Sequence, residues 1–280
     1  MDIKQILREQ SFRFNKQFGQ NFITDNFLLD GIVADSGLTS DDNVLEIGAG
    51  AGTLTRRISR VANKVVALEV DNNLRQVLDI TLADCKNASY VMADVMKMTP
   101  DAVKKLMDNK PYKVVANIPY YITTPIIMMF ADPKFGATSL TLTIQKEVAL
   151  RLAAKEGTKD YGAISVAVQS VADVEVTRII DKTMFYPIPK VDSAVVNIVF
   201  RDKYGVVEDE CFRKTVKCAF AMRRKTLLNN LLNGFEIDKQ QCIEILEKLN
   251  VRPDIRGEAL SVEQFVELAK LLKGFCNSKS

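Results

Sequence analysis

Three glycines at alternate positions, Gly48, Gly50 and Gly52, most constrain what this chain can fold into. They follow an apolar run at residues 44–47 that is typical of a buried strand, and Thr53 after them suits the start of a helix. Glycine has no Cβ, so the backbone can turn tightly and a ligand can approach the main chain. A strand, a glycine-rich turn and a helix in this order are typical of the nucleotide-binding edge of a doubly wound α/β fold. An ordinary strand-to-helix turn has the same pattern.

The composition is that of a soluble globular protein. The 280 residues, 47% hydrophobic and 26% charged, suffice for one large domain and a small one. No apolar run reaches the ~18–20 residues of a membrane span, and the N-terminus lacks the apolar core of a secretory signal. The five cysteines include no C-x-x-C pair, so we expect reduced thiols in a cytoplasmic protein. The absence of histidine excludes Ser-His-Asp and Cys-His catalysis and histidine-ligated zinc, and we expect no metal site.

Strand-like and helix-like segments alternate along the first two hundred residues. This alternation predicts a doubly wound, Rossmann-like α/β fold, with a mainly parallel, seven-stranded sheet covered by helices on both faces. The last two strands are joined by a loop without a helix, which predicts one antiparallel pair at the end. The expected strands comprise residues 44–47, 64–69, 90–92, 112–116, 139–144, 174–180 and 194–200.

From about residue 206 the pattern changes to helices alone. We place a boundary in the polar residues 202–205, which gives a domain at 1–205 and a small, all-helical domain at 206–280. From Cys211 onward there are 13 Lys and Arg against 8 Asp and Glu, a net charge of +5, whereas the preceding residues hold 25 and 27, a net charge of −2. This asymmetry fits a polyanionic partner, and it also fits a solvated helical surface. The expected helices comprise residues 208–222, 224–232, 239–249 and 261–272.

The N-terminal segment, residues 1–20, interleaves basic and aromatic side chains. This composition suits contact with RNA phosphates and bases. It suits equally an amphipathic segment that packs its phenylalanines on the body of the protein. The residues concerned are Lys4, Arg8, Arg13, Lys16, Phe12, Phe14 and Phe18.

Polar residues follow the parallel strands at the points where they end. Glu69 ends the second strand, 21 residues after Gly48, a spacing at which an acid binds the paired hydroxyls of a ribose. Asp94 follows the third strand and Asn117 the fourth, at the sheet edge where ligands bind in such folds. Nicotinamide cofactors and S-adenosylmethionine both use this edge. The G-x-G-x-G spacing preceded by Glu46 differs from the G-x-G-x-x-G dinucleotide pattern, and favours S-adenosylmethionine.

The tetrapeptide Asn117-Ile118-Pro119-Tyr120 indicates the reaction. The exocyclic amine of adenine is a poor nucleophile because its lone pair is delocalised into the ring. The side-chain oxygen of Asn117 and the carbonyl of Ile118 can accept its two N–H groups and turn the lone pair toward a methyl donor. Pro119 restricts Ile118 to extended conformations, and Tyr120 can stack on the base. Phe185, in a proline-rich loop, is a candidate second stacking wall, although its spacing fits a core residue equally.

With these motifs, the chain resembles the bacterial 16S ribosomal RNA adenine N(6)-dimethyltransferases of the kasugamycin-resistance type over nearly its whole length. The glycine turn alone is not specific, whereas the set of motifs is. The matching stretches are residues 18–22, 46–55, Glu69, Asp94, 117–120, 145–147, 161–162, 185–195 and 220–227.

The resemblance implies S-adenosylmethionine as cofactor, with Glu69 at the ribose hydroxyls, Asp94 at the adenine amine and the glycine turn at the methionine and ribose part. It implies transfer of two methyl groups to each of two adjacent adenosines in a hairpin loop near the 3′ end of small-subunit RNA, late in ribosome assembly. Ile23 and Ile118 stand where the family usually has Leu, and both changes are conservative. The implied cofactor contacts are Asn21, Ile23, Gly48, Gly50, Glu69, Asp94 and Asn117.

Arg223, Arg224 and Lys225, in an expected basic helix, are our candidates for RNA phosphate contacts, although a solvated helix face has the same composition. The 23S RNA adenine methyltransferases that confer macrolide resistance share the cofactor edge and are an alternative; residues 187–195 and 223–226 favour the small-subunit type. An RNA-binding assembly factor with secondary methylation is a further alternative. A nicotinamide dehydrogenase would need a hydride-transfer site, which we do not find. We expect a monomer that acts on 16S RNA or the immature 30S subunit.

Overall fold

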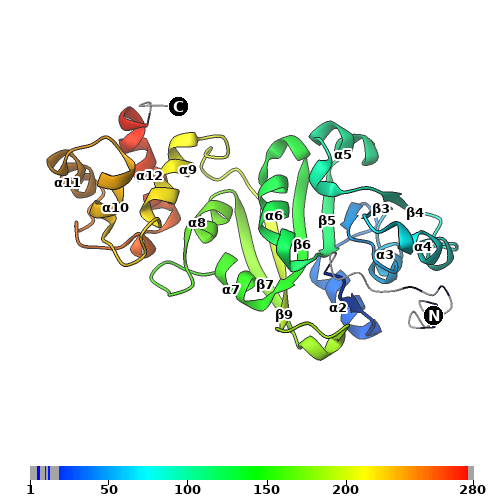
Figure 1. Cartoon of the computed structure of the whole chain (residues 1–280). Coiled ribbons are helices and arrows are strands. Elements are labelled where there is room, and N and C mark those ends of the chain that lie inside the picture. Colours follow the sequence, from blue (N-terminus) through cyan, green and yellow to red (C-terminus); the bar gives the residue numbers. More distant parts are fainter. Residues whose placement is uncertain (1–4, 7–9, 11, 13–18, 277–280) are drawn as a thin grey trace. The chain divides into compact units, whose positions relative to one another are not determined.

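A computed structural model describes residues 5–6, 10, 12 and 19–276 (Figure 1). The chain divides into two compact units. The first comprises Met1–Ala149 with Glu175–Phe200, and the second comprises Leu150–Val174 with Arg201–Ser280. The second unit therefore contains the helical residues after 206, and it also takes in a stretch that the sequence assigned to the first domain.

The framework is a seven-stranded sheet with the strand order β4-β3-β2-β5-β6-β9-β7 (Figure 1). Neighbouring strands from β4 to β6 are parallel, and β9 runs antiparallel to β6. This confirms the predicted mainly parallel sheet. The antiparallel pair was predicted between the last two strands, which are neighbours, and the antiparallel partner shown for the last strand is β6. The strands are β2 (Asn43–Ile47), β3 (Lys64–Glu69), β4 (Ala88–Met92), β5 (Tyr112–Asn117), β6 (Ala137–Gln145), β7 (Ala172–Ile180) and β9 (Ser193–Phe200).

Both faces of the central strands are buried, which is why these strands appear in the sequence as continuous apolar runs. On one face, Val65 and Val115 pack with residues of α2 (Asn26–Asp35) and α3 (Thr53–Ile58). Val66 and Val114 alternate with them and are equally buried. The helices that follow in the chain are α4 (Arg75–Thr81), α5 (Pro100–Leu106), α6 (Thr123–Ala131) and α7 (Lys146–Leu152).

Local sequence decides where these helices begin. The Oδ1 atom of Asp25 accepts a hydrogen bond from the N–H of Leu28 at 2.7 Å and caps α2. Helix α3 begins after Gly52, whose φ of 77° is left-handed and favours glycine. Helix α6 begins at Thr123, so Pro125 lies within its first turn, where a missing backbone N–H costs nothing.

The strand register brings the carboxyl ends of four parallel strands to one edge. Ile47 is paired with Leu68, and Glu69 with Met92. On the other side of β2, Asn117 ends β5. The loops after β2, β3, β4 and β5 therefore meet along this edge, as the sequence predicts.

A second, two-stranded sheet joins two distant parts of the first unit. Strand β1 (Phe22–Ile23) runs antiparallel to β8 (Phe185–Tyr186), and Phe22 is paired with Tyr186. Strands of two residues have no alternation that a sequence pattern can reveal, so this pairing was not predicted. It holds the segment before α2 against the loop before β9.

The second unit contains α8 (Ala163–Gln169), α9 (Glu210–Ala219), α10 (Leu227–Gly234), α11 (Lys239–Lys248) and α12 (Val262–Leu272). Its core gathers side chains from these helices, among them the fully buried Leu231, Leu246 and Phe265. The prediction that residues 223–225 lie in a helix is wrong, because they form the turn between α9 and α10. The Oγ1 atom of Thr226 accepts a hydrogen bond from the backbone of α10 and caps that helix, so the helix starts after the basic residues.

Cys211 and Cys276 form a disulfide within the second unit. The expectation that all five cysteines are reduced thiols is therefore wrong for this pair, while Cys85, Cys218 and Cys242 are free. The two bonded residues are 65 positions apart, with Cα atoms 5.7 Å from each other. The sequence shows no C-x-x-C spacing, and only the packing of α9 against α12 and the residues after it brings the two sulfurs together.

Most of the basic N-terminal segment lies outside the described residues, including Lys4, Arg8, Arg13, Lys16, Phe14 and Phe18. The ring of Phe12 is described, and its centroid lies 6.1 Å from that of Phe22. For Phe12, this contact supports the alternative that the phenylalanines of the segment pack on the body of the protein. Across the described part of the chain, we find no helix with the length and apolar character needed to cross a membrane.

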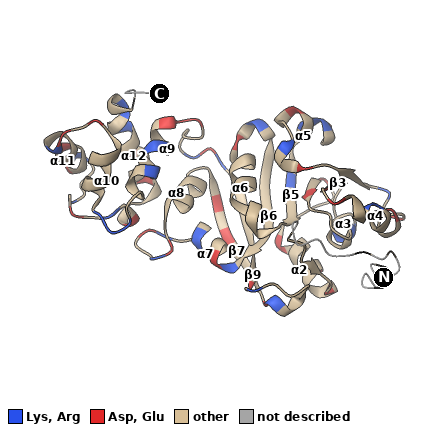
Figure 2. Ribbon diagram, viewed as in Figure 1, with Lys and Arg blue, Asp and Glu red and all other residues tan. Residues whose placement is uncertain are grey.

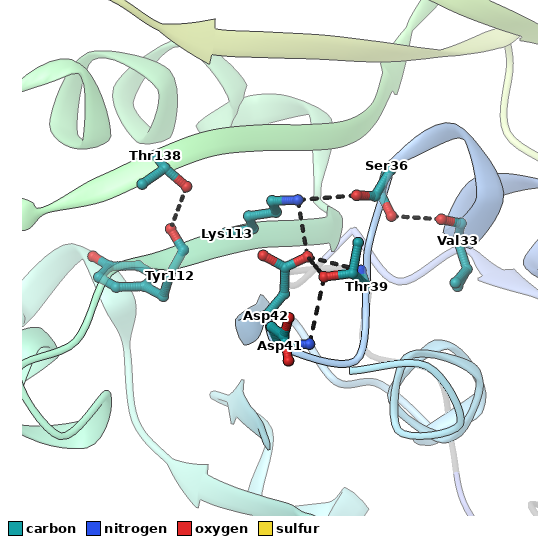
Figure 3. A network of polar contacts seen from close by, with 9 residues as sticks. Val33, Ser36, Thr39, Asp41, Asp42, Tyr112, Lys113 and Thr138 are labelled. Carbon is teal, nitrogen blue, oxygen red and sulfur yellow. Dashed lines mark hydrogen bonds and ion pairs between the residues drawn. The ribbon is translucent and has the colours of Figure 1, made fainter. Parts of the chain in front are cut away.

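A polar network holds the amino end of β5 (Figure 3). Lys113 Nζ donates to the carbonyl of Gly37 and pairs with Asp42 Oδ2, both at 2.9 Å. The backbone N–H and the hydroxyl of Thr39 donate to the same oxygen at 2.7 and 3.0 Å. Burial acts to raise the pKa of Asp42, but its bonds to Lys113 and Thr39 prevail, and the pKa lies below its ordinary value of 3.8. The network fixes the strand that carries Asn117 at its other end.

We expect Lys113→Met to lower the free energy of unfolding at pH 7 by about 1–3 kcal/mol, because Asp42 keeps its burial and loses its cation. The carboxylate stabilises the fold above its unfolded pKa, and this contribution is lost as the pH falls through the lower folded pKa. The deficit of the variant should therefore shrink between pH 4 and pH 3 in urea titrations followed by circular dichroism. Lys105→Met, at an exposed position, is the control. A deficit that does not change with pH would contradict this account.

Candidate active site

A cavity of about 250 Å³ opens at the carboxyl edge of the parallel strands. The loops after β2, β3, β4 and β5 line it together with residues 19–23. The structure thus brings together every residue predicted to contact the cofactor, and four of the five residues predicted to act on the substrate, with Asn117 in both sets. These lining residues are Asn21, Ile23, Gly48, Gly50, Glu69, Asp94, Asn117, Ile118, Pro119 and Tyr120.

The glycine turn and the acid of β3 hold each other. The N–H of Gly50 donates to Glu69 Oε2 at 2.7 Å, while the N–H groups of Val70 and Asp71 donate to Oε1, each at 2.8 Å. Gly50 has a φ of 55°, and a Cβ on it would lie 3.0 Å from the ring of Phe22. Burial raises the pKa of Glu69, against these backbone hydrogen bonds. Each carboxyl oxygen has two lone pairs, and both on Oε1 are occupied, so Oε2 can still accept one hydrogen bond from a ligand's hydroxyl.

Glu46 lines the same cavity from β2 and is 1% exposed. Burial, with a further contribution from the charge of Glu69, raises its pKa to about 8, although Thr55 opposes the shift. Its Oε2 atom has no hydrogen-bond partner within the described residues. The carboxyl is therefore protonated at neutral pH and offers an unused polar group to a ligand.

The raised pKa of Glu46 makes stability depend on pH. Between the ordinary pKa of 4.5 and about 8, the folded chain keeps a proton that the unfolded chain releases, so stability falls as the pH rises. We expect Glu46→Gln to remove this slope. The variant should match the wild type near pH 5 and exceed its free energy of unfolding at pH 8 by up to about 4 kcal/mol in urea titrations. Glu175→Gln, at an exposed position, should leave the slope intact. Parallel curves for wild type and Glu46→Gln would refute the assignment.

Asn117 is oriented by the main chain at Asn21, just before β1. Its Nδ2 atom donates to the carbonyl of Asn21 at 2.8 Å, across 96 residues of sequence. Asn21 is itself held by a bond from its Nδ2 to the carbonyl of Gly19 at 3.1 Å. Because the nitrogen of Asn117 is engaged, its Oδ1 is the atom available to accept a hydrogen bond from a ligand in the cavity.

The residues after Asn117 have little freedom. Ile118 is 2% exposed, and Pro119 has a φ of −57° and a ψ of 136°. Tyr120 starts a short 3-10 turn, and its hydroxyl shares a hydrogen bond with Ser193 Oγ at 2.8 Å. Ser193 is fully buried at the start of β9. Burial raises the pKa of Tyr120, partly offset by Ser193, so the phenol is neutral and its ring is anchored at the hydroxyl end.

The bond between Tyr120 and Ser193 predicts coupled losses of stability. Tyr120→Phe and Ser193→Ala should each lower the free energy of unfolding by about 1 kcal/mol, and the double variant should lose less than the sum. Tyr112→Phe is the matched control, because its hydroxyl donates to the carbonyl of Phe135 instead. Its loss should add to that of Ser193→Ala. Simple additivity of Tyr120→Phe and Ser193→Ala would show that this bond contributes nothing.

Two groups of predicted residues lie outside the cavity lining. Phe185 is 3% exposed and packs in the core with Ile23, Leu28 and Val195. The interpretation of Phe185 as an exposed stacking surface is therefore corrected, because its ring would have to leave the core to contact a base. Arg223, Arg224 and Lys225 belong to the second unit.

Three polar residues at the site were not among those predicted to act there. Gln20 lines the cavity, and its Nε2 donates to Asp71 Oδ2 at 2.7 Å. Asp71 is 2% exposed and also accepts from the N–H of Asn73, which caps the 3-10 turn after β3. The cap position of Asp71 was its local signal, and Gln20 lies in the motif at residues 18–22. The role of Ser193 had none, because its partner Tyr120 lies 73 residues away.

The sequence matches the family model described as ribosomal RNA adenine dimethylase over residues 11–273. It is 43% identical over 279 residues to the ribosomal RNA small subunit methyltransferase A of Clostridioides difficile (strain 630). That alignment covers 99% of this chain and 96% of the relative.

Two solved structures are similar over most of their length. A dimethyladenosine transferase from Plasmodium falciparum has a TM-score of 0.75 and 23% identity, covering 89% of this chain and 96% of that chain. The 23S rRNA methyltransferase ErmE has a TM-score of 0.70 and 25% identity, covering 90% of this chain and 100% of that chain. At 23% identity the first likeness shows a shared fold.

Proposed function

This chain belongs to the ribosomal RNA adenine dimethylase family, and from that premise we propose that its substrate is the RNA of the small ribosomal subunit. Membership confirms the family predicted from the sequence. It also confirms the reaction, the dimethylation of adenine amines in ribosomal RNA with S-adenosylmethionine as the methyl donor.

The choice of subunit is supported by the relatives. The chain is 43% identical to a protein named for the small subunit, against 25% to a 23S rRNA methyltransferase. We propose that the target is a pair of adjacent adenosines in a hairpin loop near the 3′ end of 16S RNA, presented in the immature 30S subunit. In this proposal the enzyme acts as a monomer in the cytoplasm.

The residues of the cavity fit the methyl donor. Glu69 offers the free lone pair of its Oε2 to a ribose hydroxyl, and Asp94, just after β4, suits an adenine amine. Gly48 and Gly50 have φ values of 78° and 55° that favour glycine, and their backbone without a Cβ is where we place the methionine part. Asn21 and Ile23 complete the wall. The donor supplies a methyl group already activated by a positively charged sulfur, so the chain need only hold it in place.

The observation that carries the proposed mechanism is the bond from Asn117 Nδ2 to Asn21. It leaves Asn117 Oδ1 to accept one N–H of the target amine, while the carbonyl of Ile118 accepts the other. Two acceptors in these places would turn the nitrogen lone pair out of conjugation and toward the methyl group. Tyr120, anchored by Ser193, would stack on the base. Catalysis on this account is positioning with preorganised dipoles, and it needs no general base.

Phosphate contacts are proposed for basic residues of the second unit. Arg223, Arg224 and Lys225 are exposed in the turn between α9 and α10. Arg213 and Lys217 are exposed one helical turn apart on α9, where the ribbon of Figure 2 is coloured blue for Lys and Arg. These cations would neutralise RNA phosphates without reading sequence.

Incubation with labelled S-adenosylmethionine and either immature 30S or 50S particles tests this function. We expect label in adjacent adenosines of the 3′-terminal hairpin of 16S RNA, with dimethyladenosine as the final product. Asn117→Ala should lower kcat by about 100-fold or more, because the amine loses an oriented acceptor. Ser170→Ala, which removes a hydroxyl bonded only within its own helix, is the control. Label confined to 23S RNA would reject the small-subunit assignment.

The basic turn predicts a change in salt dependence. Replacing Arg223, Arg224 and Lys225 with alanine should reduce the slope of log K against log salt concentration by about 2–3, because three phosphate contacts are lost. Binding of labelled RNA measured at four or five salt concentrations gives this slope. The control is the Lys239→Ala and Lys248→Ala double variant, with both changes at exposed positions of α11. An unchanged slope in the triple variant would show that this turn does not meet RNA.

A further inference from the structure

Three residues that line the cavity are large, apolar and exposed, namely Val70, Met96 and Tyr121. Val70 and Met96 follow β3 and β4, close in sequence to Glu69 and Asp94, at the part of the cavity assigned to the methyl donor. Tyr121 is the aromatic member of the three and is 63% exposed. It directly follows Tyr120, at the part of the cavity assigned to the target base.

The ring of Tyr121 is supported on one side. A Cβ built on Gly19 would lie 3.7 Å from Tyr121 Cε1 and 3.4 Å from Pro119 Cβ. Gly19 has a φ of 57°, which favours glycine, so the ring rests beside bare backbone and next to a proline. The exposed remainder of the ring is an apolar surface at the rim of the cavity. An aromatic side chain has few rotatable bonds, so holding it there costs little conformational entropy.

The chemistry of the substrate determines what reaches this surface. A target adenine must leave its stack to enter the cavity. Each neighbouring nucleotide is tied to it by one phosphodiester link, so the neighbouring bases stay at the rim while the target is inside. An unstacked base exposes its apolar faces to water, and exposed aromatic rings are the usual platforms for such bases.

We propose that Tyr121 is a second nucleobase subsite, on which a base adjacent to the target adenosine stacks while the target occupies the cavity. This inference rests on the proposed function, because it needs a target nucleotide in an RNA strand. It assigns different roles to two successive tyrosines: Tyr120 meets the base that reacts, and Tyr121 holds its neighbour.

Single-turnover methylation tests the subsite by varying the ring and the base together. Small-subunit particles are reconstituted with RNA in which each neighbour of the target adenosine is replaced in turn by an abasic nucleotide. With intact RNA, Tyr121→Ala should lower kcat/KM by about 5- to 100-fold, the range expected for one stacked base. When the abasic nucleotide replaces the base that stacks on Tyr121, the kcat/KM of the wild type should fall by a similar factor. On that RNA, Tyr121→Ala should lower kcat/KM little further. Tyr121→Trp should restore activity on intact RNA.

Phe27→Ala is the control, because Phe27 is 89% exposed but does not line the cavity. Its effect, if any, should be the same on intact and abasic RNA. If Tyr121→Ala lowers kcat/KM by the same factor on intact RNA and on both abasic RNAs, the ring and the neighbouring bases act independently, and the subsite is rejected. Wild-type protein that labels the target in intact particles but shows no such coupling would leave the proposed function standing and reject this inference alone. Failure of wild type to label small-subunit adenosines would reject both.

Discussion

The hydrogen bond from Asn117 to the carbonyl of Asn21 is the constraint on which the candidate site depends. It ties the end of β5 to a segment 96 residues earlier, and that segment forms one wall of the cavity. The same bond engages the nitrogen of the Asn117 amide, and the proposed mechanism uses its free oxygen as the acceptor for the substrate amine. Pairing of β1 with β8 holds the segment from its other side. The orientation of the Asn117 amide and the position of one cavity wall thus both depend on this tertiary contact.

Burial sets the electrostatics around this contact. Glu46 and Glu69 are buried on the neighbouring strands β2 and β3, and burial raises the pKa of both. Three backbone N–H groups stabilise Glu69, whereas Glu46 relieves the repulsion by holding its proton. When one of two buried carboxyls keeps its proton, the pair carries less than two negative charges. It then needs no metal or cation between its members. The site can therefore present acidic groups to a cationic donor while the fold stays stable.

Much of the fold followed from apolar periodicity. The runs at β2, β3 and β5 predicted a parallel sheet because strands buried on both faces must be apolar throughout. Strand ends then predicted Glu69, Asp94 and Asn117 at one edge. The prediction that residues 223–225 are helical was wrong because Thr226 caps α10. The helix therefore begins later than apolar spacing alone indicates. The disulfide, the β1–β8 pairing and the assignment of residues 150–174 to the second unit depend on contacts that leave no local pattern.

The sequence by itself determined the sheet, its ligand-binding edge, the glycine turn and the tetrapeptide at residues 117–120, because each is encoded within a few neighbouring residues. Tertiary structure alone decided how the tetrapeptide is held. Asn21 orients Asn117, Ser193 anchors Tyr120, and Phe185 is buried although its sequence fitted an open wall equally well. These outcomes join residues from 73 to 96 positions apart or depend on burial among several elements. Packing in three dimensions determines such contacts, and local spacing does not.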